Sequence, residues 1–187
     1  MTLGGFVLIA VVALLVVLAV VAYNRLVALR QRSESAWSDI DVQLKRRTDL
    51  VPNLVETVKG YAAHERATLD QVIRARGAAV AATSPESRAQ AENQLTAALR
   101  QLFAVAEAYP DLKANASFQT LQASLGEIED ALQSARRYYN AVVRDLNTAI
   151  ESFPSNVVAG FFRFARRAYF ELDRPEDRQA PRVSFGS

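Results

Sequence analysis

The sequence LGGFVLIAVVALLVVLAVVA, residues 3–22, decides how the rest of the chain is organised. It contains no charge, no proline and no strong hydrogen-bonding side chain. A helix of this length, at about 1.5 Å per residue, matches the hydrocarbon thickness of a bilayer, roughly 30 Å. A helix also satisfies every backbone N–H and C=O group within the segment, as a lipid environment requires. The stretch therefore predicts a transmembrane helix.

A cleaved signal peptide is the alternative interpretation of this stretch. Only Met1 and Thr2 precede it, so the positively charged region of a signal peptide is missing. The apolar run is also longer than the usual h-region of about 7–15 residues, and no clean A-x-A cleavage site ends it. These features favour a retained anchor over a cleaved signal peptide.

The charges that flank the apolar run indicate its orientation. Arg25, Arg30 and Arg32 follow it closely, whereas the N-terminal side carries only the α-amine. The positive-inside rule places the more basic flank in the cytoplasm. We therefore expect a single-pass protein of the inner (cytoplasmic) membrane, with its N-terminus outside and its folded domain in the cytoplasm.

The composition favours helices and excludes several classes of protein. Seven glycines and six prolines are few for 187 residues, and strands would need more turn residues. The absence of cysteine excludes disulfides, thiolate metal sites, cysteine nucleophiles and lipid attachment through cysteine. The formal net charge of +2 is too small to indicate a nucleic-acid partner by itself.

An apolar stripe continues beyond the transmembrane segment. Its members recur at steps of three and four residues from Leu26 to Arg76, a spacing typical of a long amphipathic helix with a near-heptad repeat. Pro52 removes one backbone hydrogen bond and crowds the preceding turn, so it predicts a kink or a break. Because the stripe keeps its phase across Pro52, a kink is favoured. We expect one long helix that leaves the bilayer and continues as a stalk.

Two further long helices follow. Ser84-Pro85 combines a helix cap with a residue suited to the first helical position, and Tyr109-Pro110 marks the end of this second helix. Residues 118–153 show the cleanest three–four alternation in the chain, which predicts a third helix ended by Pro154. The second helix is the shortest of the three. We expect the three helices to form an antiparallel, coiled-coil-like bundle.

A fourth, short helix is predicted over residues 157–170, with Asn156 as its cap. The predicted fold class is therefore all-α: an N-terminal transmembrane helix continues into a long antiparallel helical bundle of three long helices plus a short C-terminal helix. The predicted domains are a transmembrane anchor at residues 1–24, a helical bundle at residues 25–172 and an extended C-terminal tail at residues 173–187.

Several motifs resemble the LemA family in order and spacing, over essentially the whole chain. They are Tyr23-Asn24, Trp37–Asp49, Asp49–Val55, Tyr61–Glu65, Ala75-Arg76, Tyr109–Lys113, Arg137–Asn140, Phe153-Pro154 and Ala180–Phe185. In the last motif, Arg182 and Ser184 stand where members of the family often have Lys and Asp. The resemblance implies a bacterial single-pass membrane protein with a helical-bundle domain, a short external N-terminus and a cytoplasmic domain. It implies no established biochemical function.

The sequence contains no recognisable catalytic or cofactor motif. His64 is the only histidine, and His64-Glu65 does not extend to H-E-x-x-H because position 68 is Thr68. A dinucleotide-binding glycine motif and a P-loop are both missing, and no two Glu-x-x-His units could build a di-metal site in a bundle. We therefore expect no enzyme activity, no cofactor and no metal site.

Polar residues that interrupt the apolar pattern form the first set of candidate site residues. In coiled coils such groups pair across helices and fix the register between them. The other interpretation is that they bind a ligand or a partner, and the register interpretation is favoured over it. The set comprises Arg47, Glu65, Arg76, Asn140 and Asn147.

The fourth predicted helix supplies the second set. Phenylalanines opposite arginines are typical of an interfacial helix that inserts its rings into anionic lipid. The same pattern fits a helix whose phenylalanines cover the end of the bundle while its arginines are solvated. The candidate lipid or partner contacts are Phe161, Phe162, Arg163, Arg166 and Arg167.

Two functional hypotheses follow from these features. The first is a membrane-anchored, non-enzymatic scaffold that presents its bundle to the cytoplasm and self-associates, because its alanine-rich second helix permits close helix approach. The second is a membrane-shaping or membrane-bridging assembly that uses residues 157–170. The expected partners are the lipid bilayer, further copies of the chain and a membrane protein, and nucleic acid is not expected.

Overall fold

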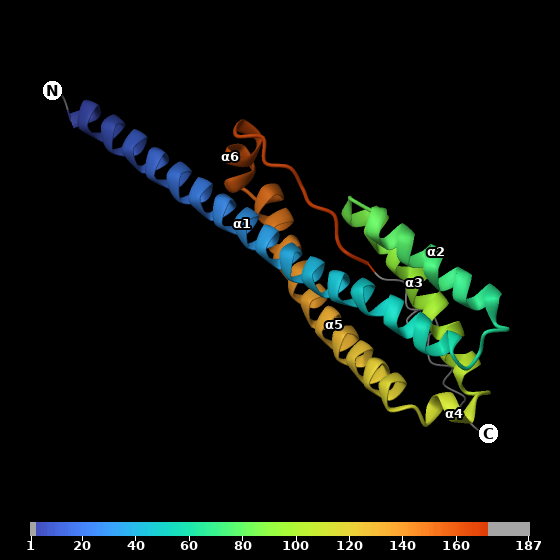
Figure 1. Ribbon diagram of the computed structural model, residues 1–187. Helices are drawn as coiled ribbons and strands as arrows, with labels where there is room; N and C mark the ends of the chain where they lie inside the picture. The colour runs from blue at the N-terminus through green and yellow to red at the C-terminus, as the bar shows by residue number, and fades with distance from the viewer. Residues whose placement is uncertain (1–2, 172–187) are drawn as a thin grey trace, which may run out of the picture. The chain divides into compact units, whose positions relative to one another are not determined.

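The computed structural model describes residues 3–171, and within that range the fold is all-α, as predicted. The helices are α1 (Leu3–Lys59), α2 (Arg66–Ala81), α3 (Pro85–Ala106), α4 (Pro110–Lys113), α5 (Ala116–Glu151) and α6 (Ser155–Phe161), as Figure 1 shows. No strand occurs among residues 3–171. The predicted tail, residues 173–187, lies outside the described residues.

Helix α1 contains the predicted transmembrane segment. Its most apolar 18-residue window has a mean hydropathy of 3.3 and no buried residue, so the helix is long and apolar enough to cross a membrane. The helix passes the predicted domain boundary after residue 24 without interruption. It also continues through Pro52, which excludes a break at that position.

The prediction that the first helix runs on to Arg76 is wrong. Helix α1 ends at Lys59, and the backbone turns over residues 60–65 before α2 begins. The carbonyl of Val58 accepts two hydrogen bonds from this turn, at 3.0 and 2.8 Å. Gly60 is a weak helix former, and the turn preserves the three–four phase of the stripe. The apolar pattern therefore gave no sign of the break.

The chain divides into two compact units. Within the described range, the first unit contains residues 3–44 and 129–169, and the second contains residues 45–128 and 170–171. Helices α1 and α5 each contribute to both units. Each unit has its own cluster of buried apolar side chains.

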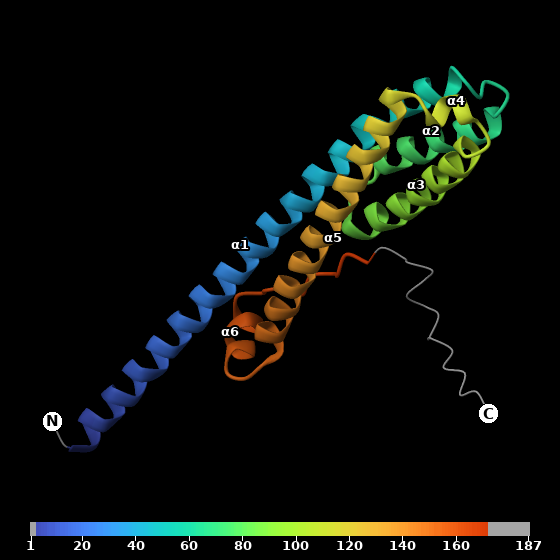
Figure 2. The same ribbon diagram turned by 90° about the horizontal axis from the view of Figure 1, so that it is seen from below.

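In the second unit, α2 and α3 lie side by side (Figure 2). Buried alanines on both helices, such as Ala75 and Ala98, permit this close approach. Larger side chains complete the core, and each fully buried leucine contributes about 1.5–3 kcal/mol relative to exposure. The buried leucines and aromatic ring of this core are Leu54, Leu69, Leu95, Leu99, Leu102, Leu112, Phe118 and Leu125.

The predicted start of α3 is confirmed by its capping interactions. The Ser87 backbone N–H donates to Ser84 Oγ at 3.1 Å, and the Ser84 N–H donates to Ser87 Oγ at 3.0 Å. This reciprocal pair is a capping box, and Pro85 follows it at the first turn. The helix ends at Ala106 rather than at Tyr109, because Tyr109 already caps the short helix α4.

The predicted third helix is confirmed as α5, whereas the predicted helix over residues 157–170 is wrong beyond Phe161. Helix α6 ends there, and its N-cap is Pro154 rather than Asn156. Residues 164–171 are not helical. The physical reason is that Arg163 takes a left-handed φ of 56°, which stops the helix.

Candidate membrane-proximal site

Aromatic rings near α6 lie against the end of the apolar part of α1. In the first unit, the Tyr23 ring centroid lies 4.6 Å from that of Phe162 and 5.9 Å from that of Phe164. Tyr23 directly follows the apolar residues 3–22. Helix α6 is therefore beside α1 at the level where the apolar segment ends, and both views show it there (Figure 1, Figure 2). Tyrosine at this level is typical of the membrane–water interface.

The outer surface around α6 is rich in exposed large apolar side chains. Phe161 is 81% exposed, so it does not cover a buried core. The inner face of the same helix does pack, because Ala159 lies in a buried cluster with Leu26 and Ala149. A group of exposed large apolar side chains marks a contact surface. The exposed group comprises Phe153, Val157, Phe161 and Phe162.

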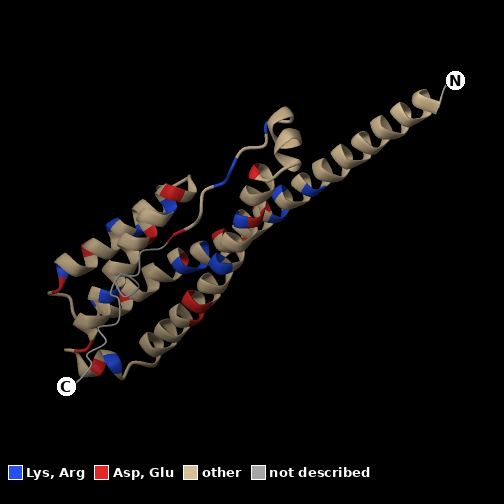
Figure 3. Cartoon of the chain, turned by 180° about the vertical axis from the view of Figure 1, so that it is seen from behind, with Lys and Arg blue, Asp and Glu red and all other residues tan. Residues whose placement is uncertain are grey.

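Four arginines border a pocket of about 390 Å³ in the first unit. Three of them belong to the segment that follows α6, where Figure 3 shows the basic residues in blue, and Arg30 comes from α1. The Arg30 guanidinium lies over the Phe164 ring, 5.4 Å from its centroid. The pocket is lined by Arg30, Leu146, Arg163, Phe164, Ala165, Arg166 and Arg167.

Two of these arginines are paired with carboxylates. Arg167 Nη2 lies 2.7 Å from Glu34 Oε1, and Arg166 Nη1 lies 2.9 Å from Glu151 Oε1. Both pairs are partly exposed, and such pairs contribute about 0–1 kcal/mol each. Arg163 is exposed and makes no ion pair with any residue in the range 3–171. The pocket therefore carries more positive charge than its neighbouring carboxylates compensate.

Buried side chains of α5 hold residues 163–169, here called the arginine segment, in place. Asn147 Nδ2 donates to the Arg167 carbonyl, and the Arg167 N–H donates to Asn147 Oδ1, both at 2.9 Å. The Tyr139 hydroxyl donates to the Ala168 carbonyl at 3.0 Å. Asn147 thus bonds to the non-helical segment rather than to a neighbouring helix, and Asn140 lies half-buried on the same helix.

In the second unit, Arg47 forms a buried ion pair. Its Nη1 lies 3.0 Å from Glu92 Oε2, and its Nη2 donates to Thr96 Oγ1 at 2.9 Å. The Arg47 and Glu92 side chains are only 2% and 1% exposed. The pair joins α1 to α3, and Arg76 Nε of α2 donates to the Thr48 carbonyl of α1 at 2.8 Å. That these bonds set the register between the helices stays a prediction.

Glu65 lies in the turn before α2 rather than on a helical stripe. It is the N-cap residue of α2, and its Oε1 accepts a hydrogen bond from the Tyr109 hydroxyl at 3.2 Å. Burial raises the pKa of the Tyr109 hydroxyl, and both the hydrogen bond to Glu65 and the charge of this carboxylate raise it further. The contact joins two turns of the second unit.

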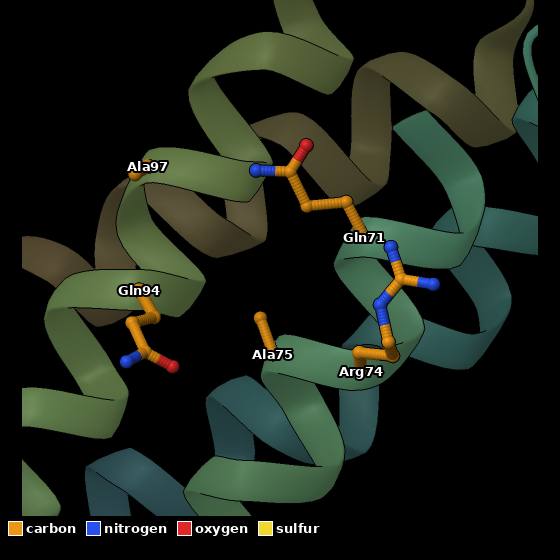
Figure 4. Close-up of a pocket in the computed structure, with 5 residues that line it drawn as sticks. All are labelled: Gln71, Arg74, Ala75, Gln94 and Ala97. Carbon is orange, nitrogen blue, oxygen red and sulfur yellow. The ribbon is translucent and has the colours of Figure 1, made fainter. Parts of the chain in front are cut away.

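A second pocket lies between α2 and α3, with a volume of about 330 Å³. Figure 4 shows Gln71 and Arg74 extending from α2 and Gln94 from α3. Amide and guanidinium groups of this kind provide no pair of acid and base for catalysis. His64 is exposed in the turn after α1, and no cluster of His, Cys, Asp or Glu suited to a metal occurs among residues 3–171.

Sequence reasoning missed two parts of these sites. Glu92 and Thr96 are not among the residues predicted from the sequence. The signal that could have found Glu92 is its position three residues before Leu95, where it interrupts the apolar face of α3. Arg30 was considered only as a flanking charge. Its place beside Phe164 depends on the return of α5 and α6 to α1, which no local pattern encodes.

The comparison with protein families agrees with the motif analysis. The sequence model of the LemA family matches residues 36–185, which is well over half of the chain. The chain belongs to the LemA family. In this LemA protein the match includes the buried Arg47 and the arginine segment after α6, whereas the apolar residues 3–22 precede it.

Curated relatives of this LemA protein include proteins with two different names. "Magnetosome protein MamQ 1" and "Magnetosome protein MamQ 2" of Paramagnetospirillum magneticum are each 27% identical, in alignments that cover 86% of this chain and 71% of theirs. "Protein LemA" of Metamycoplasma hominis is 27% identical over 157 residues, which cover 82% of this chain and 70% of that protein. Neither name is that of an enzyme.

Proposed function

We propose that this LemA protein is a membrane-anchored, non-enzymatic scaffold that presents its helices to the cytoplasm and self-associates. The continuity of α1 is the observation that supports this proposal best. One helix contains an apolar segment with no buried residue and, from Leu26 onward, side chains buried in the first unit. The anchor and the folded unit therefore share a helix instead of a flexible linker.

The fate of the buried polar side chains also supports a non-enzymatic role. Arg47 and Glu92 are bonded to each other, and Asn147 is bonded to a backbone segment. Enzyme sites instead bring several ionisable groups together around a space for substrate. These three buried side chains thus hold helices and segments together.

The proposed orientation gains support from the arginine segment. Arg163, Arg166 and Arg167 join Arg30 around a single pocket, on the polar side of Tyr23. They add to the positive charge that follows the apolar segment, and positive charge near a membrane-spanning helix favours the cytoplasmic side. The proposed location is the inner membrane, with the N-terminus outside.

A second candidate function is membrane shaping, because Phe161 and Phe162 are exposed beside Tyr23. Apolar side chains that enter one leaflet at the interface can respond to or change its curvature. Two kinds of membrane contact are conceivable for α6: contact with the membrane that α1 crosses, and bridging to a second membrane. The contact between the Tyr23 and Phe162 rings favours the first.

We expect the full chain in maltoside micelles to form assemblies of two or more copies, which light scattering with detergent correction measures. A mass of one chain at every protein concentration would contradict self-association.

The same preparation in phosphatidylcholine vesicles tests the second candidate, membrane shaping, by electron microscopy. Smaller vesicles with the wild type than with the Phe161→Ser/Phe162→Ser variant favour membrane shaping, and equal diameters contradict it.

A further inference from the structure

Arg163 occupies a backbone position that favours glycine. Its φ is 56°, in the left-handed region that costs a residue with a side chain roughly 1–2 kcal/mol. The Arg163 N–H bonds to the Gly160 carbonyl at 3.3 Å, and the Phe164 N–H bonds to the Ala159 carbonyl at 2.9 Å. These two bonds form a Schellman motif, in which Arg163 holds the position where glycine is the usual residue.

The place of this strained residue indicates a functional role for its side chain. Residues held in sparsely populated backbone conformations cluster at binding and catalytic sites. Arg163 is exposed, so its side chain contributes little to packing. Arg163 is instead the fourth arginine that lines the pocket, beside Arg30, Arg166 and Arg167.

The chemistry of the pocket fits a phosphate group. Guanidinium groups bind phosphate oxygens through paired, charge-assisted hydrogen bonds, which makes arginine the preferred residue for such sites. Four arginines line the pocket, and two of them, Arg166 and Arg167, pair with the carboxylates of Glu151 and Glu34. The excess of positive charge remains available to an anion.

The surroundings of the pocket indicate where the phosphate comes from. The lining also contains Leu146 and Phe164, apolar side chains that a free phosphate ion cannot use. Phe164 contacts Tyr23 at the end of the apolar segment, and Phe162 is exposed beside the same tyrosine. A lipid at the membrane surface offers a phosphate for the arginines and apolar atoms for these side chains.

We propose that this pocket binds the phosphate group of an anionic glycerophospholipid from the membrane that α1 crosses. The proposal rests on the proposed membrane anchoring for the source of the lipid. It assigns to Arg163 the principal contact with the phosphate, with Arg30 and Arg166 beside it. The strain at Arg163 is then the cost of placing a guanidinium at the membrane surface.

The test uses the full chain in maltoside micelles, mixed with phosphatidylglycerol or phosphatidylcholine, and counts retained lipids by native mass spectrometry. We expect the wild type to retain phosphatidylglycerol at concentrations where phosphatidylcholine is lost. Arg163→Gly should weaken phosphatidylglycerol retention about tenfold, the loss of one charged contact. The same variant should melt about 2–4 °C higher, because glycine removes the strain.

The matched control is Arg137→Gln, which removes the same charge from an exposed position on α5 outside the pocket. It should retain phosphatidylglycerol as the wild type does. Equal retention by all three proteins would overturn the proposal. Displacement of phosphatidylglycerol by inorganic phosphate at equal concentration would overturn the assignment to lipid. Each copy of the chain binds its own lipid in this assay. The measured lipid retention therefore does not depend on whether the chain self-associates.

Discussion

Replacement of Arg47 by methionine is expected to lower the free energy of unfolding by about 3–5 kcal/mol. The change leaves the Glu92 carboxylate, which is 1% exposed, without the guanidinium that lies 3.0 Å from it. Removing one member of a buried ion pair is costly because no water replaces the interaction that the remaining charge loses. Urea unfolding in maltoside micelles, followed by far-ultraviolet circular dichroism, measures the effect.

The exposed pair between Lys45 and Asp49 provides the control for this substitution. These side chains are 74% and 57% exposed and lie 2.9 Å apart, on the same helix as Arg47. Lys45→Met should therefore change the free energy of unfolding by less than about 0.5 kcal/mol. If Lys45→Met and Arg47→Met destabilise the protein equally, burial of the Arg47 pair has no special energetic role.

The double variant Arg47→Met/Glu92→Leu separates stability from register. Because both charges are replaced by apolar groups, its stability should return to that of the wild type or exceed it. If the pair sets the register of α1 against α3, the variant should lose a single well-ordered packing. Broadened methyl resonances from the second unit would report this loss, whereas wild-type line widths would contradict the register role.

Asn147→Ala is expected to free the arginine segment from α5. The substitution removes both hydrogen bonds between the Asn147 side chain and the Arg167 backbone, each 2.9 Å long. Each group left without a partner in a partly buried place costs about 1–3 kcal/mol. Hydrogen exchange should show loss of protection over residues 164–169.

Asn156→Ala is the matched control, since Asn156 is an exposed asparagine in α6 of the same unit. Its removal should leave exchange in the arginine segment unchanged. Unchanged protection in Asn147→Ala as well would show that the remaining contacts, such as Tyr139 with Ala168, are sufficient to hold the segment.

Local sequence patterns predict the helices well where a cap or a long apolar repeat marks them. Ser84 and Pro85 set the start of α3, and the repeat of α5 set its extent to within two residues at each end. These signals act within a few residues of the backbone they control, so one sequence is enough to find them.

The two wrong boundaries have a different origin. The turn after Lys59 keeps the phase of the apolar stripe, and a periodic pattern cannot distinguish one straight helix from two helices joined in phase. Residues 162–170 have helical spacing of apolar side chains, yet Asn147 and Tyr139 bind this backbone in a non-helical form. Contacts between distant parts of the sequence overrode local preference in that segment.

The candidate site depends even more on long-range contacts. The alternation of phenylalanines and arginines over residues 161–167 identified these residues as candidates. The same pattern did not predict how close they lie to the membrane segment. The contact between Phe162 and Tyr23 brings them to the end of the apolar segment, and that contact forms only in the folded chain.

Cysteine labelling tests whether residues 3–22 cross the inner membrane and hold the helices in the cytoplasm. The chain has no cysteine, so single variants give a clean signal. In spheroplasts, a membrane-impermeant maleimide should label Thr2→Cys but not Gln122→Cys, which lies exposed on α5. Gln122→Cys should react only after lysis. Labelling of Gln122→Cys in intact spheroplasts, or release of the chain from membranes by alkaline carbonate, would contradict the account.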